Sequence, residues 1–418
     1  MQNIIALQKF FCYNNLNFER KVLHLKLNFC SLIIFFTALI ICGCSLGETQ
    51  ANLNNSAAEE IQKNVDKIRQ DSGVAPKFSE VVEVDPVEEI LKSMTLEEKI
   101  GQMMIAGFHG TTANDDVKFM LNNYHFGGII LFDRNMESKA QVKTLTADLQ
   151  VGRKIPLFIA IDEEGGIVSR MKHDLTPPPS QKEIGQSGDA TLAYRSAFEI
   201  SQELKNIGVN LNFAPVADVG TPDDRSFSDN GEVVADFVAN AALGYKKAGI
   251  FYTLKHFPGI GLWKVDSHQD LSIIDADRNT LETIDLFPFK KIITENDNSE
   301  FMVMVGHYIY TAFDAENSAT LSPAIMKNLL RDELNFSGVV ITDDLDMGAV
   351  SKNHAQKDLG AASIKAGADI VLSCHDYEKQ KAIYEGIFDA VKRGEISEER
   401  INDSVRRILK MKLELISK

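Results

Sequence analysis

The chain has 418 residues, a formal net charge of −15, 44% hydrophobic residues and 25% charged residues. This is the composition of an ordinary globular protein, with enough apolar material for one large domain or two medium ones. The acidic balance, without a basic patch that could neutralise phosphates, argues against nucleic acid as a partner.

The amino-terminal part contains an uncharged apolar run, LIIFFTALII, from Leu32 to Ile41, with basic residues before it. This run is too short to span a bilayer as a helix, but it suits the apolar core of an export signal. It ends in ICGC, which resembles a bacterial lipobox. We therefore expect a lipoprotein signal peptide over residues 1–43 and an exported protein held at a membrane by lipidated Cys44, facing the periplasm or the cell exterior. A signal peptide with incidental cysteines and an uncleaved anchor are the alternatives.

The stretch after Cys44 is polar and poor in aromatic residues up to about residue 85. It predicts a flexible tether, residues 44–85 including the lipidated cysteine, that leads into a single domain over residues 86–418. Only Cys374 would remain in that domain after cleavage, so no disulfide framework is possible there and the fold must depend on its apolar core.

The domain alternates short apolar runs with segments of helical pattern. The eight apolar runs are MMIAGF (103), GGIILF (127), LFIAID (157), LNFAPV (211), FYTLKH (251), FMVMVGH (301), GVVITDD (338) and ADIVLSC (368). The helical segments include 139–149, 190–207, 232–247, 323–334 and 377–392, and a last helix starts at Ser397, which we expect to be its N-cap. The runs are mostly apolar on both faces, as parallel strands covered by helices must be. We predict a (β/α)8 TIM barrel, with a doubly wound open sheet as the main rival.

Ionisable residues gather where these runs end. In chain order they are Asp162, Arg170, Asp218, Arg225, Lys255, His256, Asp266, His268, His307, Asp343 and Asp344. Each one taken alone has a simpler interpretation, such as a helix N-cap, a hydrogen-bonded core residue or a polar turn. Their joint placement at the carboxyl ends of barrel strands, where desolvating each of them has a cost, predicts an active site.

The motifs in this order resemble glycoside hydrolase family 3, in particular its single-domain branch of β-N-acetylhexosaminidases. The resemblance runs from MTLEEKIGQMMIAGF at Met94 to RILKMK at Arg407 and includes IDEEGGIVSRM, NFAPVADV, RSF, KHFPG, DSH and GVVITDDLDMGAV. It implies a TIM barrel and an exo-acting retaining hydrolase that removes terminal β-linked N-acetylglucosamine from peptidoglycan or chitin-type oligosaccharides. It implies a carbohydrate substrate, no metal and no cofactor.

The resemblance also implies roles for individual residues. The nucleophile would be Asp343, and the general acid/base would be His268, oriented by Asp266. The residues that would hold the sugar are Asp162, Arg170, Arg225, Lys255 and His256. A histidine titrates near neutrality, so it suits both half-reactions while a carboxylate sets its tautomer. We expect Lys255 or Arg225 to lower the pKa of Asp343, which must stay ionised.

One loop departs from the family pattern. The family usually reads KHFPGHGDT before its DSH motif, whereas this chain reads KHFPGIGLWKV, which brings in Ile260, Leu262 and Trp263. This leaves open how the loop is supported and what it admits on the leaving-group side; Trp263 either stacks on a sugar or covers the underside of the loop. Three other functions also stay open: a phosphorylase that uses phosphate in place of water, a β-glucosidase, and a sugar-binding lipoprotein without catalysis.

Overall fold

The computed structural model describes residues 85–261, 272–352 and 354–417. The predicted signal peptide and nearly all of the predicted tether lie outside these ranges. The predicted residues outside them are Cys44, Leu262, Trp263, Asp266 and His268. No helix within the described ranges is long and apolar enough to cross a membrane.

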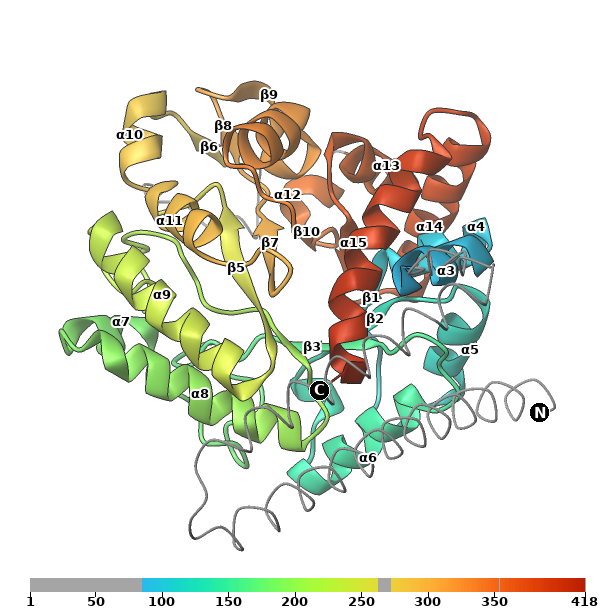
Figure 1. The fold of residues 1–418 in the computed structure, drawn as a ribbon, viewed down its shortest axis with the longest axis horizontal. Helices are drawn as coiled ribbons and strands as arrows, with labels where there is room; N and C mark the ends of the chain where they lie inside the picture. Colours follow the sequence, from blue (N-terminus) through green and yellow to red (C-terminus); the bar gives the residue numbers. More distant parts are fainter. Residues whose placement is uncertain (1–84, 262–271, 353, 418) are drawn as a thin grey trace, which may run out of the picture. The chain divides into compact units, whose positions relative to one another are not determined.

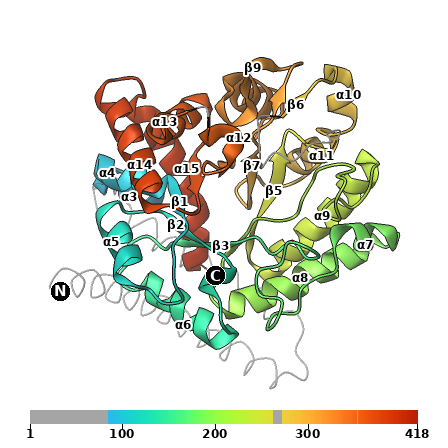
Figure 2. The same ribbon diagram turned by 180° about the vertical axis from the view of Figure 1, so that it is seen from behind.

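The predicted barrel is confirmed (Figures 1 and 2). Its strands are β1 Met104–Ala106, β2 Gly128–Leu131, β3 Phe158–Ile161, β4 Leu211–Asn212, β5 Phe251–Phe257, β7 Phe301–Val305, β10 Val339–Asp344 and β11 Ile370–Ser373. They close in the order β1-β11-β10-β7-β5-β4-β3-β2, and every pair is parallel. Each strand corresponds to one of the apolar runs, and the closed order rules out the open sheet.

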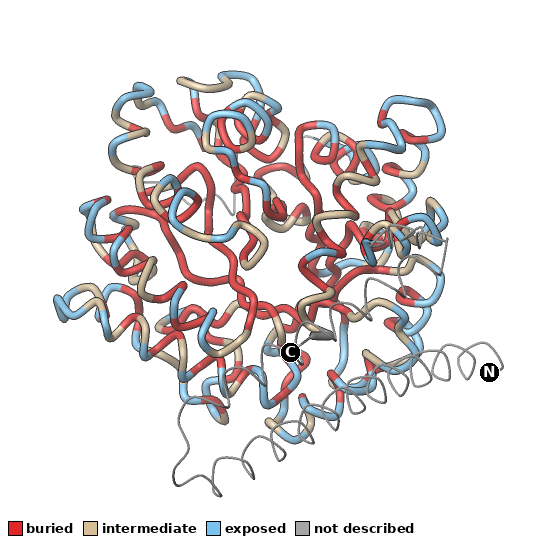
Figure 3. The backbone as a smooth tube through the Cα atoms, in the orientation of Figure 1, coloured by how far each residue is buried: buried red, intermediate tan, exposed pale blue. Residues whose placement is uncertain are grey.

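The strands are buried on both faces, as their apolar pattern predicts. Every residue of β2, β3, β5 and β7 is buried. Figure 3 shows the inner ring of strands as buried, while exposed residues lie mainly on the outer sides of the surrounding helices. This is the arrangement that forces a parallel strand to be apolar throughout its length.

Helices surround the barrel. They are α3 Pro86–Ser93, α4 Leu96–Gln102, α5 Asp115–Asn123, α6 Lys139–Gln150, α7 Gln181–Gln186, α8 Ala190–Asn206, α9 Gly231–Ala248, α10 Arg278–Thr283, α11 Phe287–Glu295, α12 Gly348–Ser351, α13 Gln356–Ala366, α14 Tyr377–Lys392 and α15 Glu398–Ser417. The predicted N-cap of α15 is confirmed, because Ser397 Oγ accepts a hydrogen bond of 3.1 Å from the backbone N–H of Arg400. The side chain of Asn230 caps α9 in the same way.

Some local structure differs from the sequence prediction. The segment predicted as a helix over 323–334 is helical, but Ala324–Glu333 (η3) is a π-helix, in which the N–H of Leu334 bonds the carbonyl of Leu329. A small sheet of β6 Ile273–Ile274, β8 Ile309–Tyr310 and β9 Asp314–Ser318 was not predicted. Short 3₁₀ turns, η1 Asp133–Asn135 and η2 Ala319–Leu321, complete the connections. Strands β6 and β8 are too short for a period-2 pattern to show in the sequence, and β9 reads DAENS, which has no apolar alternation.

The amino-terminal end of the barrel is closed by a lysine from α15. Lys412 is fully buried, and its Nζ donates to the carbonyl of Gly127 at 2.6 Å and to Gln102 Oε1 at 2.8 Å. The ammonium also lies 4.8 Å from the centre of the Phe158 ring. Burial lowers the pKa of Lys412 well below its usual value. The opposite, carboxyl-terminal end of the strands holds the cavity described next.

Candidate active site

A cavity of about 700 Å³ lies at the carboxyl ends of the strands. It is lined by every predicted site residue within the described ranges, namely Asp162, Arg170, Arg225, Lys255, His256 and Asp343. Apolar side chains of the strands and their ends form its floor, among them Ile130, Phe213, Met304 and Leu372. The convergence that the sequence predicted therefore holds for these residues. Predicted acid/base His268 and its partner Asp266 lie outside the described residues.

Asp162 at the end of β3 is paired with two cations. Its Oδ1 is 2.8 Å from Lys255 Nζ, and its Oδ2 is 3.1 Å from an Arg170 nitrogen. Burial alone would raise the pKa of Asp162, but Lys255 and Arg170 outweigh burial and hold this pKa well below its usual range. The three side chains are therefore charged at neutral pH and present a fixed set of donors and acceptors to a ligand.

Glu164, two residues further on, was not predicted as a site residue. Its carboxylate accepts a bidentate pair of hydrogen bonds from Arg225, at 2.8 and 2.9 Å, and lies 2.5 Å from Lys255 Nζ. Burial opposes ionisation, but Lys255 and Arg225 lower the pKa of Glu164 to about 2. Glu164 thus holds Arg225, the predicted sugar-binding arginine, in one orientation.

His256 is held by Asp218. The Asp218 carboxylate accepts from His256 Nδ1 at 2.8 Å and from the His256 backbone N–H at 3.0 Å. Because a carboxylate only accepts, Nδ1 carries a proton. The same carboxylate accepts from the N–H of Ile260 at 3.1 Å. Asp218 therefore orients His256 and fixes the start of the segment after β5. The alternative interpretation of Asp218 as a helix N-cap is wrong.

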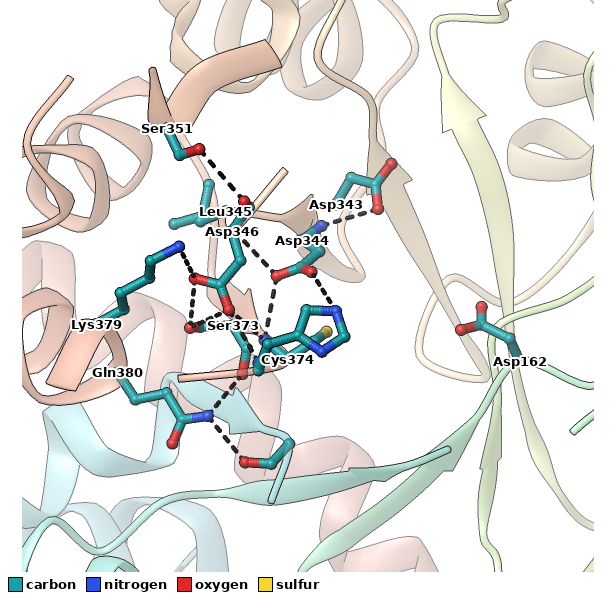
Figure 4. A network of polar contacts seen from close by, with 12 residues as sticks. Asp162, Asp343, Asp344, Leu345, Asp346, Ser351, Ser373, Cys374, Lys379 and Gln380 are labelled. Carbon is teal, nitrogen blue, oxygen red and sulfur yellow. Dashed lines mark hydrogen bonds and ion pairs between the residues drawn. The ribbon is translucent and has the colours of Figure 1, made fainter. Parts of the chain in front are cut away.

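Asp343, the predicted nucleophile, ends β10 on the far side of the cavity from Asp162 (Figure 4). Its Oδ1 accepts from the N–H of Asp344 at 2.8 Å. Burial by itself raises the pKa of Asp343, but nearby His256, His307 and Lys255 together hold it below its usual value. The expected help from Lys255 is present, whereas Arg225 is paired with Glu164. Asp343 is ionised at neutral pH.

A network of carboxylates fastens the end of β10 to β11 (Figure 4). Asp344 Oδ1 accepts from the backbone N–H groups of Asp346 at 3.0 Å and Cys374 at 3.1 Å. Asp346 Oδ2 in turn accepts from the N–H groups of Cys374 at 3.1 Å and His375 at 2.9 Å. The regular pairing of the two strands shifts between Ile341 and Asp344, so side-chain oxygens here replace ladder bonds. Burial first, and then the like charge of Asp346, raise the pKa of Asp344 to about 7.

His307, after β7, supports the same strand end from the other side. Its Nε2 lies 2.9 Å from the carbonyl of Asp344 and its Nδ1 lies 2.7 Å from Thr320 Oγ1. Burial lowers the pKa of His307. Its Nε2 donates to Asp344, because a carbonyl can only accept. The end of β10 is therefore held to β11 by its own side chains, Asp344 and Asp346, and to the segment after β7 by His307.

Comparison with known proteins places this site in a family. A profile of the glycosyl hydrolase family 3 N terminal domain matches residues 95–411. The chain belongs to glycosyl hydrolase family 3. The resemblance seen in the sequence motifs is thereby confirmed at the level of family and fold.

Relatives within glycosyl hydrolase family 3 are similar over most of the chain. A β-hexosaminidase A of Pseudoalteromonas piscicida is 35% identical over 338 residues, which is 73% of this chain and 56% of the relative. A β-hexosaminidase of Nitrosomonas eutropha is 33% identical over 288 residues, 66% of this chain and 81% of the relative. A solved family 3 β-N-acetylglucosaminidase from Paenibacillus sp. is 40% identical with a TM-score of 0.75, covering 77% of this chain and 63% of that one. The chain thus matches little more than half of the length of the Pseudoalteromonas piscicida relative.

Sequence reasoning missed some residues of this family 3 site. They are Glu164, Asp346 and His375, together with Asp218 and Asp344, which it noted at the strand ends without giving them a role. Glu164 had a signal, because it stands two residues after Asp162 and alternate residues of an extended segment share a side. Asp346 had none, since its partners, the backbone N–H groups of Cys374 and His375 and the side chains of Ser373 and Lys379, all come from a distant segment of the chain.

Proposed function

We propose that this chain is an exo-acting retaining β-N-acetylhexosaminidase that releases terminal β-linked N-acetylglucosamine from peptidoglycan or chitin-type oligosaccharides. The observation that carries the proposal is an ionised carboxylate, Asp343, across the cavity from a fixed cluster of paired charges around Lys255. Apolar side chains of the barrel strands close the inner end of the cavity, so a sugar chain can enter only with its terminal residue first. The names of the relatives, β-hexosaminidase and β-N-acetylglucosaminidase, support the same substrate class.

In the proposed mechanism, Asp343 attacks the anomeric carbon and forms a glycosyl-aspartate ester, while His268 gives a proton to the leaving oxygen. The deprotonated His268 then takes a proton from water, whose oxygen attacks the anomeric carbon and releases Asp343. Asp266 orients His268. Within the described cavity, Glu164 cannot serve as this acid, because its pKa of about 2 leaves it ionised at neutral pH. A histidine with a pKa near neutrality suits the task.

The sugar would be held by the charged groups opposite the nucleophile. Asp162 and Glu164 accept from sugar hydroxyls, while Arg170, Arg225 and Lys255 donate to hydroxyl and acetamido oxygens. Because these groups already neutralise one another, they are oriented before the sugar binds, and little side-chain entropy is lost on binding.

A panel of 4-nitrophenyl β-glycosides tests the proposed activity. We expect the N-acetylglucosaminide to be cleaved much faster than the glucoside, with free sugar of retained configuration as the product, both with and without phosphate. Release of a sugar 1-phosphate in phosphate buffer would identify a phosphorylase instead. Equal rates on the glucoside would identify a β-glucosidase. Absence of both turnover and labelling by a fluorinated glycosyl donor would leave only sugar binding.

We also propose that the full chain is exported and anchored to a membrane through lipid on Cys44, as its apolar run and ICGC sequence indicate. When the full chain is expressed in bacteria, the Cys44→Ser variant should move from the membrane fraction to the soluble fraction and lose labelling by a fatty-acid analogue. The matched control is Cys42→Ser, which leaves the modified position intact and should stay in the membrane. Retention of Cys44→Ser in the membrane would point to an uncleaved anchor.

A further inference from the structure

The mouth of the cavity carries three apolar side chains on the side formed by the loops after β3, β4 and β5, where Thr221 and Asp223 also line the cavity. Ile167 follows β3, Pro222 follows β4 and Ile260 follows β5, and all three line the cavity. These strands are neighbours in the barrel, so the three residues lie on consecutive loops. The backbone N–H of Ile260 is fastened to Asp218, and Gly166, next to Ile167, lies against Asp224 of the loop after β4. We call Ile167, Pro222 and Ile260 the apolar lip.

The position of Ile167 is not explained by stability. Its side chain is 60% exposed, so it gains little from burial. It stands in a tight turn in which Gly165 and Val168 exchange backbone hydrogen bonds of 3.2 and 3.1 Å. Gly166 has a φ of +56°, and a Cβ there would lie 2.6 Å from Ser180 Cβ and 2.7 Å from Asp224 Oδ2. The turn is therefore closely packed at Gly166, and this packing fixes the exposed side chain of Ile167 at the mouth of the cavity.

The apolar lip contrasts with the charged groups deeper in the same cavity. Lys255 and Glu164 have side chains that are 3% and 2% exposed, and both take part in ion pairs. A ligand that reaches from these groups to the lip must be polar at its inner end and carry apolar surface at its outer end. A sugar with a leaving group that is partly apolar meets this requirement.

The order of the strands shows which part of the substrate meets the lip. Asp343 ends β10, and β3 lies opposite β10 in the closed order of the barrel. Displacement by Asp343 expels the leaving group from the face of the anomeric carbon that points away from this carboxylate. The leaving group therefore points away from β10, toward the half of the mouth formed by the loops after β3, β4 and β5.

We propose that the apolar lip is the binding site for the leaving group, and that the preferred substrates carry an apolar face on the group next to the terminal sugar. This inference rests on the proposed function, because it takes Asp343 as the nucleophile. Ile167, with 60% of its surface exposed, is the lip residue that we assign to specificity, since it would touch only the part of the substrate that departs.

Binding of two uncleavable ligands tests the lip independently of catalysis. The ligands are the S-linked methyl and hexyl β-N-acetylglucosaminides, which share the sugar and differ in apolar area. We expect calorimetry to show that the wild-type protein binds the hexyl compound about tenfold more tightly than the methyl compound. In Ile167→Ser this ratio should fall by a factor of about three to five, while the affinity for the methyl compound stays within about twofold.

Matched variants separate the lip from general surface effects. Ile167→Val keeps most of the apolar area and should keep most of the preference. Val151→Ser removes another exposed aliphatic side chain, 70% exposed, from the end of α6 and outside the residues that line the cavity, and should change nothing. Equal hexyl-to-methyl ratios in the wild type and Ile167→Ser, or failure of either ligand to bind, would overturn the inference. If both ligands bind as expected but no O-linked glycoside is cleaved, the proposed function fails, and the lip is a binding site for the group next to the sugar but not for a leaving group.

Discussion

Replacing Asp343 by asparagine is expected to lower kcat on an N-acetylglucosaminide by about a thousandfold or more, with the fold and sugar binding intact. The amide has nearly the same size as the carboxylate, but it is a poor nucleophile and carries no charge to stabilise the oxocarbenium-like transition state. Steady-state kinetics give kcat, and calorimetry with an uncleavable sugar analogue gives the affinity. Because Asp343 forms a bond only during the reaction, its loss should affect kcat far more than binding.

A second variant tests the bond that Asp343 is proposed to form. In Asp343→Gly the space left by the side chain admits azide, which should restore turnover of an activated substrate and give the glycosyl azide of inverted configuration. The control is Asp223→Asn, which removes another cavity-lining carboxylate and should leave kcat within about fivefold. Among the described residues, Asp223 accepts a single hydrogen bond, from the backbone N–H of Arg225, which an asparagine oxygen can also accept. More than a tenth of wild-type activity in Asp343→Asn would show that another group attacks the sugar.

Glu164→Gln is expected to lower the free energy of unfolding by about 3 to 5 kcal/mol at pH 7 and to weaken sugar binding. The glutamine cannot balance the charges of Arg225 and Lys255. Lys255 would keep Asp162 as an ion-pair partner, whereas Arg225 would lose its bidentate carboxylate in a largely buried site. The NH₂ group of the glutamine amide is a hydrogen-bond donor, and it would face Lys255 or Arg225, whose side chains can only donate. Urea unfolding of the two proteins at one temperature measures the difference.

This loss should depend on pH in a definite direction. The pKa of Glu164 is about 2 in the folded chain and about 4.3 in an unfolded chain. Its contribution is therefore complete above about pH 4.3 and is lost as the pH falls toward 2, so the gap between wild type and Glu164→Gln should shrink over that interval.

The adjacent carboxyl group is a matched control for Glu164. Glu163 is buried and has no ion pair with any residue that the structure describes. Its Oε2 accepts from the N–H of Arg170, and burial raises its pKa. Glu163→Gln should therefore be neutral or slightly stabilising at pH 7. Equal losses of stability in the two variants would mean that the Glu164 ion pairs contribute nothing specific.

The strands and helices could be predicted because their signals are local. A strand such as β5 is apolar throughout its seven residues because neighbouring strands and helices cover both of its faces. A helix such as α15 starts where Ser397 can satisfy a free backbone N–H. Both signals can be read without knowing which elements are neighbours. The small sheet of β6, β8 and β9 has no such signal, because β6 and β8 have two residues each and β9 reads DAENS, without an apolar run. The pairing of β6 with β8 also joins residues that are distant in the sequence.

Part of the candidate site could likewise be predicted from the sequence, and part could not. The sequence placed Asp162, Lys255 and Asp343 at strand ends, and a barrel brings all strand ends to one rim, so their convergence followed from the fold class alone. The assignment of His268 and Asp266 comes from their motif and stays a prediction.

Only the tertiary structure decided which charges meet. Arg225 could have faced Asp343, but it pairs with Glu164, 61 positions away, because the loops after β3 and β4 lie side by side. Asp346 fastens β10 to β11 through backbone N–H groups that carry no side-chain signal. Ion pairs act over a few ångströms, whereas sequence patterns specify each element by itself, so the position of one loop against the next had to come from packing.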